Sequence, residues 1–142
     1  MRSVVAAVAL SLLTAAGCGR GDRPPTAEPQ VDRLAPITVQ RTGGIAGVQD
    51  EVIVQPDGSW GRTVGAGGRL PPDRNAALTR MAADPALRAE AARTPGEGDC
   101  ADAFEYTLSV GELRVSWTDC DETPPPVASR IARLLLDGTN PK

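Results

Sequence analysis

Hydrophobic and polar residues alternate most regularly in the segment FEYTLSVGELRVSWT, residues 104–118. Apolar side chains occupy every second position on either side of Gly111-Glu112: Phe104, Tyr106, Leu108 and Val110 before it, and Leu113, Val115 and Trp117 after it. A period of two is typical of a strand with one buried face. A turn at Gly111-Glu112 pairs Val110 with Leu113 and Tyr106 with Trp117, so the apolar side chains share one face. The pattern therefore predicts an antiparallel hairpin of fixed register.

The part of the chain before position 65 carries a second set of strand patterns. Residues 35–44 (APITVQRTGG) place Ile37 and Val39 on one face and end at a pair of glycines. Residues 52–54 (VIV) and 59–64 (SWGRTV) are two further β-rich runs, separated by the sequence QPDG. Proline and glycine supply the backbone angles that tight turns need. We therefore predict a three-stranded meander in this part of the chain.

After position 64 the chain changes from strand to helix patterns. The glycine-rich segment 64–70 (VGAGGRL) lacks the spacing and the lysine of a phosphate-binding loop, and we interpret it as a flexible connector. Asp73 is the expected N-cap of a first helix. Asp84-Pro85 combines a capping aspartate with a proline at the first helical position, which predicts a second helix that ends at Gly96 and Gly98.

A third helix is expected after the prolines at 124–126. Its apolar residues fall on one stripe: Val127, Ile131, Leu134 and Leu135. This stripe can cover the apolar face of the strands. The order of strands, helices, hairpin and helix predicts an α+β fold. We expect a small two-layer sandwich over residues 35–138, in which an antiparallel sheet, made of the N-terminal meander and the C-terminal hairpin, is covered by about three helices. Residues 139–142 form a tail.

The first 34 residues differ in character from the rest. Arg2 precedes an uncharged apolar run that reaches Ala16, about half the length that a membrane-spanning helix needs. Such a start is typical of a secretory signal, and the small residues before Cys18 resemble a bacterial lipobox. In this interpretation residues 1–17 are the signal peptide, Cys18 carries a diacylglycerol, and residues 18–34 are a lipidated flexible tether. The alternative is an ordinary signal peptide, with Cys18 a free or disulfide-bonded thiol.

The three cysteines of the chain are an odd number, which in a secreted protein needs an explanation. If Cys18 carries lipid, Cys100 and Cys120 remain as a pair. They lie beyond the open ends of the predicted hairpin and miss an in-register pairing by about three residues, so their Cα atoms come within about 7 Å only through a bulge or loop. We predict a structural disulfide, because the chain contains no CxxC redox motif. A closed zinc site is not expected, because the chain contains no histidine.

Composition argues against several classes of function. Without histidine there is no Ser/His or Cys/His pair, and we expect no catalytic residue, no cofactor and no metal, and therefore no enzyme. The net charge is −3 and the basic residues are scattered, so we expect no nucleic-acid partner. The acidic pairs Asp50-Glu51 and Asp121-Glu122 keep a calcium-stabilised module open as a minor alternative. Tyr106 and Trp117 form either a core pair or a binding platform.

Two stretches, ITVQRTGGIAG and FEYTLSVGELRVSWTDCDETPPPVASRIARLLL, resemble the emfourin-like proteins, the protealysin-inhibitor group that blocks thermolysin-type metalloproteases. The first matches an opening strand that ends in Arg-x-Gly-Gly, here Arg41, Gly43 and Gly44. The second matches the closing part of the family through Asp121, Pro125 and a Leu-rich helix. The resemblance covers roughly residues 35–138 and implies the same fold. A Phe-x-x-Leu-Pro-like segment and a last-strand histidine, usual in the family, are absent from this chain.

Taken together, these features predict a membrane-tethered extracytoplasmic lipoprotein with a non-catalytic, protein-binding domain. Its expected partners are the lipid membrane, through Cys18, and a secreted metalloprotease or other envelope protein; inhibition of thermolysin-like enzymes is what the resemblance implies. We expect partner contact at the first turn, through Arg41, Gly43, Gly44 and Ile45, with Ile45 either exposed there or tucked into the core. The alternative is a small-ligand-binding or envelope-sensing lipoprotein with a pocket between sheet and helices.

Overall fold

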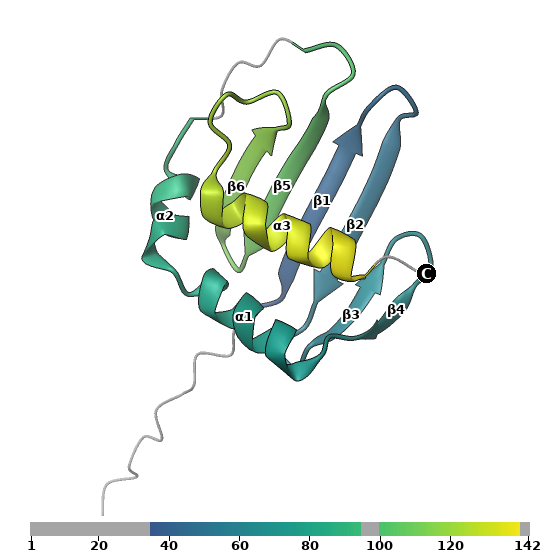
Figure 1. Cartoon of the computed structure of the whole chain (residues 1–142), viewed down its shortest axis with the longest axis vertical. Coiled ribbons are helices and arrows are strands. Elements are labelled where there is room, and N and C mark those ends of the chain that lie inside the picture. The colour runs from purple at the N-terminus through teal and green to yellow at the C-terminus, as the bar shows by residue number, and fades with distance from the viewer. Residues whose placement is uncertain (1–34, 95–99, 140–142) are drawn as a thin grey trace, which may run out of the picture. The chain divides into compact units, whose positions relative to one another are not determined.

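Six strands form one antiparallel sheet in the order β4-β3-β2-β1-β5-β6, and three helices pack on it. The computed structural model describes residues 35–94 and 100–139. Along the chain the elements are β1 (Ile37–Gly43), β2 (Val48–Val54), β3 (Ser59–Arg62), β4 (Gly67–Arg69), α1 (Pro72–Ala82), α2 (Pro85–Ala91), β5 (Phe104–Val110), β6 (Leu113–Thr118) and α3 (Pro126–Gly138). All three helices lie on one face of the sheet (Figure 1). The predicted α+β fold is confirmed.

The first strand, β1, joins the two strand groups that the sequence pattern predicted separately. It pairs with β2 on one side and with β5 on the other. Val39 stands opposite Val52 in β2 and opposite Leu108 in β5, and all three side chains are fully buried. The hairpin of β5 and β6 has the predicted register, with Val110 opposite Leu113 and Tyr106 opposite Trp117. The apolar residues of both groups therefore form one continuous face.

The last helix, α3, supplies the other side of the core. Its buried residues are Val127, Ala128, Ile131, Ala132, Leu135 and Leu136. Steps of three and four residues place them on one stripe, as predicted. Leu134 is partly buried and packs against the core, and Leu136, which the prediction did not include, is also buried. Each fully buried Leu or Ile contributes about 1.5–3 kcal/mol relative to an exposed one.

A charged side chain from another helix satisfies the start of α3. Pro125 and Pro126 offer no side-chain cap at its start, and the carboxylate of Glu90 in α2 takes that role. Its two oxygens accept hydrogen bonds from the backbone N–H groups of Val127 (2.8 Å) and Ala128 (2.9 Å). Glu90 is only 6% exposed. A carboxylate is favourable here because the N-terminus of a helix carries a partial positive charge.

Of the two aspartates predicted to cap the first two helices, one does so and the other does not. Asp84 caps α2 as predicted, accepting a hydrogen bond from the N–H of Ala86 (2.9 Å). Asp73 does not cap α1, because the helix begins at Pro72 and Asp73 lies in its first turn. Proline fixes φ at a helical value and has no N–H to satisfy, so the Pro71-Pro72 pair starts the helix without a side-chain cap.

The second helix is shorter than predicted. It ends at Ala91, and the next residue, Ala92, closes it with a helical backbone conformation. The backbone N–H of Ala92 bonds to the carbonyl of Arg88, and no glycine is used at this end of α2. Gly96 and Gly98, which were expected to end the helix, lie outside the described residues.

The segment 64–70 is not the flexible connector that its glycines suggested. Residues Gly67–Arg69 form the edge strand β4, which pairs with β3. Gly68 stands opposite Trp60, and a Cβ atom on Gly68 would lie 3.1 Å from the indole ring. The glycine therefore allows the backbone of β4 to lie against this ring, and pairing with the neighbouring strand β3 holds a segment whose own sequence does not favour a strand.

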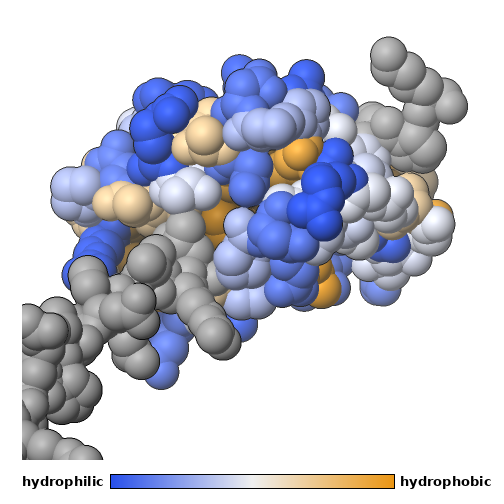
Figure 2. Space-filling view, turned by 90° about the horizontal axis from the view of Figure 1, so that it is seen from below, coloured by the Kyte–Doolittle hydropathy of each residue, from blue (hydrophilic) through white to orange (hydrophobic). Residues whose placement is uncertain are grey.

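The surface of the described residues shows few large hydrophobic side chains. Those exposed are Ile45 (89%), Val64 (64%) and Ile53 (36%). From the lower side of the molecule the surface is mainly hydrophilic, and hydrophobic residues show only as small separate areas (Figure 2). Within the described ranges, none of the helices is both long and apolar enough to cross a membrane.

Candidate functional site

The turn between β1 and β2 presents the most exposed large hydrophobic side chain of the described residues. Gly43, Gly44 and Gly47 all have positive φ, and the N–H of Gly47 donates to the carbonyl of Gly44 (3.0 Å). This backbone carries Ile45 at its tip, with 89% of its surface exposed. The alternative in which Ile45 is tucked into the core is therefore wrong. Positive φ is readily available only to glycine, which explains the sequence of the turn.

The glycines of this turn also allow a second chain segment to approach it. A Cβ atom on Gly43 would lie 2.4 Å from the carbonyl oxygen of Ala103, and one on Gly44 would lie 2.7 Å from the ring of Phe104. The N–H of Gly44 donates a hydrogen bond to the same Ala103 carbonyl (3.1 Å). The turn is thus held from the side by the residues that lead into β5.

Arg41 belongs to this region but differs from Ile45 in its surroundings. Its guanidinium lies over the ring of Phe104, 5.2 Å from the ring centre, and its Nη2 is 3.3 Å from Oδ2 of Asp50. About 30% of its side chain is exposed. Arg41 therefore holds Phe104 against the turn, and only part of its surface is accessible to a partner.

Asp50 forms the centre of an ionic cluster that sequence reasoning missed. Its carboxylate receives two hydrogen bonds from the guanidinium of Arg62, one of them 2.7 Å from Nε to Oδ1, in addition to the contact with Arg41. The hydrogen bonds from Arg62 lower the pKa of Asp50 against the opposing effect of burial, and the charges of Arg62 and Arg41 lower it further. The same hydrogen bonds raise the pKa of Arg62. Asp50 is therefore ionised, and both of its carboxylate oxygens accept hydrogen bonds from arginine side chains.

This cluster extends to the end of α3. The guanidinium Nη1 of Arg62 lies 3.4 Å from the carbonyl oxygen of Leu136 and 3.5 Å from the hydroxyl of Thr139. That hydroxyl in turn donates to the carbonyl of Leu135 (2.6 Å). A cation at the C-terminus of a helix meets a partial negative charge. Arg62 thus links Asp50 in the sheet to the last turn of α3.

Three carboxylates of the two acidic pairs accept hydrogen bonds from other groups of the chain. Asp50 is neutralised by two guanidinium groups, and Glu51 accepts a hydrogen bond from the side chain of Gln40. Asp121 accepts hydrogen bonds from the backbone N–H and the hydroxyl of Thr118, at the end of β6. Among the residues that the structure describes, no three Asp, Glu, Cys or His side chains gather as a metal site requires.

The predicted disulfide between Cys100 and Cys120 is present, with Cα atoms 6.3 Å apart. The register of β5 and β6, continued past its last pair, places Cys120 opposite Ala103, three residues from Cys100, as expected. A turn at residues 101–102 closes this gap. Asp102 adopts a positive φ of 69° in that turn, a conformation that aspartate tolerates better than most residues.

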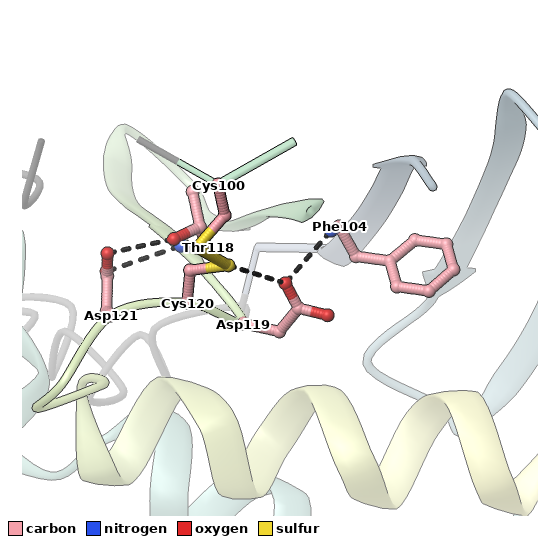
Figure 3. The surroundings of a disulfide bond; sticks show 6 residues. All are labelled: Cys100, Phe104, Thr118, Asp119, Cys120 and Asp121. Atoms are coloured by element: carbon pink, nitrogen blue, oxygen red, sulfur yellow. Dashed lines mark hydrogen bonds between the residues drawn. A yellow bond between two sulfur atoms is a disulfide. The ribbon is translucent and has the colours of Figure 1, made fainter. Parts of the chain in front are cut away.

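Asp119 fastens the disulfide to the start of β5 (Figure 3). The backbone N–H of Phe104 donates to its Oδ1 (3.0 Å), and the N–H of Asp119 donates to the carbonyl of Phe104 (3.1 Å). Figure 3 shows the ring of Phe104 pointing away from the disulfide, and this is the ring that lies beneath Arg41 and beside Gly44. The disulfide and the glycine turn are therefore connected through one residue.

These segments meet at one end of the sheet (Figure 1). We call this end the loop end and define it as the turn 43–47, the segment 100–104 and residues 119–121. It joins Gly43, Gly44 and Ile45 of the predicted contact turn to the disulfide, and Arg41 contacts it through the ring of Phe104. Cys18 lies outside the described residues.

The aromatic pair Tyr106 and Trp117 belongs to the core. The rings stack at 5.2 Å between centres with 8° between their planes, and Trp117 is 5% exposed. Between the sheet and α3, the side chains of Val39, Leu108 and Leu135 are fully buried. The space in which the alternative hypothesis placed a ligand pocket is occupied here by packed aliphatic side chains.

Comparisons with models of protein families, with curated proteins and with solved structures gave no match to this chain.

Proposed function

We propose that this protein is a lipid-anchored, extracytoplasmic inhibitor of thermolysin-type metalloproteases that acts through its loop end. The observation that carries the proposal is Ile45, which is 89% exposed at the tip of a turn whose backbone is restrained on several sides. A hydrophobic side chain at a fixed position suits an apolar specificity pocket. Binding such a turn costs little conformational entropy, because the turn is already ordered.

The same turn is a poor substrate. Proteases bind their substrates as extended strands, whereas Gly43, Gly44 and Gly47 have positive φ and the turn is closed by its own hydrogen bond. The bond from Gly44 to Ala103 and the ring of Phe104 oppose opening of the turn. A protease that takes up Ile45 therefore meets a backbone that does not adopt the conformation needed for cleavage.

Replacement of Ile45 tests the contact. An Ile45→Ala variant should bind a susceptible thermolysin-type enzyme at least about tenfold more weakly, because a buried isoleucine contributes about 1.5–3 kcal/mol. Val64→Ala is the matched control, since Val64 is also an exposed aliphatic residue but lies in the turn between β3 and β4. The inhibition constant measured with a peptide substrate gives the comparison. If the native chain leaves several such enzymes fully active at micromolar excess, inhibition is refuted.

Replacement of Cys18 tests the anchor. A Cys18→Ser variant cannot receive the diacylglycerol, and it should move from the membrane fraction to the soluble fraction of the producing cell. Stable anchoring needs two or more acyl chains, and a lipoprotein carries them on this single residue. Immunoblotting of the two fractions, with the native chain beside the variant, measures the shift. Unchanged membrane association of the variant would contradict the lipid anchor.

A further inference from the structure

The Cys100–Cys120 disulfide lies where it can control the candidate binding turn. Helix α2 ends at Ala91 and β5 begins at Phe104, so the connection between them is long, residues 92–103. The disulfide fixes this connection at position 100 and leaves only residues 101–103 before the strand. The carbonyl of Ala103 then accepts the hydrogen bond from Gly44.

A continuous series of contacts runs from the sulfur atoms to Ile45. The disulfide holds the chain at Cys120 beside Asp119, and Asp119 forms reciprocal hydrogen bonds with Phe104. The ring of Phe104 lies beside Gly44, and Gly44 precedes Ile45 in the chain. No step of this series passes through the hydrophobic core between the sheet and α3, so the series can loosen while the core stays packed.

We infer that the loop end is a composite binding surface, formed by the turn 43–47 and the segment 100–104, which is complete only when Cys100 and Cys120 are oxidised. The reduced chain holds a folded core and an incompletely ordered turn, and oxidation of the pair completes the surface. The consequence for inhibition rests on the proposed function, whereas the ordering of the turn does not.

The oxidation step is a thiol–disulfide exchange with an oxidised dithiol protein. The thiolate of one cysteine attacks a sulfur of the oxidant's disulfide and forms a mixed disulfide. The thiolate of the other cysteine then attacks the sulfur of the first, and the oxidant's thiol leaves. The Cys100–Cys120 bond forms, the oxidant's S–S bond breaks, and the oxidant leaves as two thiols that carry the two electrons and two protons. Cys100 is exposed and Cys120 is half-buried, so the pair is accessible to such a partner.

Amide hydrogen exchange tests the inference directly. The full chain is used with Cys18→Ser, so that only the Cys100–Cys120 pair is present, and it is compared before and after reduction. The N–H of Gly44 should exchange at least tenfold faster in the reduced form. Two N–H groups outside the loop end serve as controls: that of Gly58 donates to the carbonyl of Gln55 (2.9 Å), and that of Leu70 donates to the carbonyl of Gly58 (2.9 Å). Their exchange rates should change less than twofold.

Two further variants sharpen the test. Cys100→Ser combined with Cys120→Ser should show fast exchange at Gly44 with or without reductant, which separates loss of the bond from effects of the reagent. Asp119→Ala keeps the disulfide but removes the carboxylate that accepts the hydrogen bond from the N–H of Phe104. The exchange rate at Gly44 in this variant should lie between those of the oxidised and the reduced protein. Unchanged exchange at Gly44 on reduction overturns the inference. Equal acceleration at Leu70 also overturns it, because the disulfide then stabilises the whole domain.

An inhibition assay on the same samples separates this inference from the proposed function. If oxidised protein inhibits and reduced protein inhibits at least tenfold less, both stand. If exchange at Gly44 accelerates on reduction but the oxidised protein inhibits no thermolysin-type enzyme, the disulfide-dependent ordering of the turn stands and the inhibitor proposal fails. If both forms inhibit equally and Gly44 does not respond, the inference fails and the inhibitor proposal stands.

Discussion

Replacement of Glu90 by glutamine isolates the capping of α3. Glutamine has the volume of glutamate but keeps only one acceptor oxygen, so the N–H of Val127 or Ala128 loses its partner and faces an amino group instead. Loss of one hydrogen bond to a charged group costs about 1.5–3 kcal/mol. The favourable interaction of the carboxylate with the helix terminus, about 0.3–1 kcal/mol at exposed sites and up to about 2 kcal/mol at partly buried ones, is also lost. We expect Glu90→Gln to lower the free energy of unfolding by about 3 kcal/mol.

Urea unfolding followed by tryptophan fluorescence measures this loss, because Trp117 is buried in the native core and exposed on unfolding. A domain of this size has a total stability of about 5–15 kcal/mol, so the change is large. The melting temperature should fall by roughly 12–24 °C. In the native protein the amide protons of Val127 and Ala128 should appear strongly downfield, as expected for donors to a carboxylate, and the variant should lose this shift in at least one of them.

Glu112→Gln is the matched control. Glu112 is an exposed glutamate in the turn between β5 and β6, and its replacement should change the stability by less than about 0.5 kcal/mol. If Glu90→Gln costs less than about 1 kcal/mol while the control is neutral, the N–H groups of α3 do not depend on this carboxylate. The reasoning about the capping of α3 would then be refuted.

Two further predictions concern the ionic cluster and the glycine turn. Hydrogen bonds from Arg62 lower the pKa of Asp50, so this pair stabilises the fold above the ordinary pKa of an aspartate, about 3.9, and the contribution is lost as pH falls through the lowered value. Urea midpoints should therefore fall more steeply below pH 4 in the native protein than in Asp50→Asn; parallel curves would contradict this role. Gly43→Ala should cost at least about 2 kcal/mol, because its Cβ meets a backbone carbonyl at 2.4 Å and its φ is +100°. Gly47→Ala, which has open space around its Cβ, should cost clearly less in the same unfolding assay, and equal losses would remove the steric argument.

Local patterns in the sequence determined much of the fold. The period of two in residues 104–118 set the strands, the turn and the register of the hairpin, because a shift by one residue would move every apolar side chain to the wrong face. The apolar stripe of α3 and the capping aspartate Asp84 are likewise local signals. The disulfide followed from the same register, since it placed both cysteines just past the open ends of the hairpin.

The candidate site was predicted only in part. Arg-x-Gly-Gly marked the turn, but its sequence did not show whether Ile45 is exposed or buried, because a turn of four residues can direct a side chain either way. The contact of the turn with Ala103 and Phe104 joins residues about sixty positions apart. Only the pairing of β1 with β5 brings them together, and no local pattern specifies which strand lies beside which.

The sequence by itself determined the hairpin, most of the other strands and helices, and the cysteine pair, because these depend on residues close together in the chain. The edge strand β4 is the exception, since its glycines do not favour a strand and it forms by pairing with β3. The tertiary structure alone decided what Glu90 and Arg62 do. Glu90 and Arg62 have no distinguishing neighbours in the sequence, yet they satisfy opposite ends of α3, from a helix and a strand that precede it in the chain. The physical reason is that hydrogen bonds at helix ends and buried ion pairs depend on distances in space, which are set once the hydrophobic face of the sheet has packed against the helices.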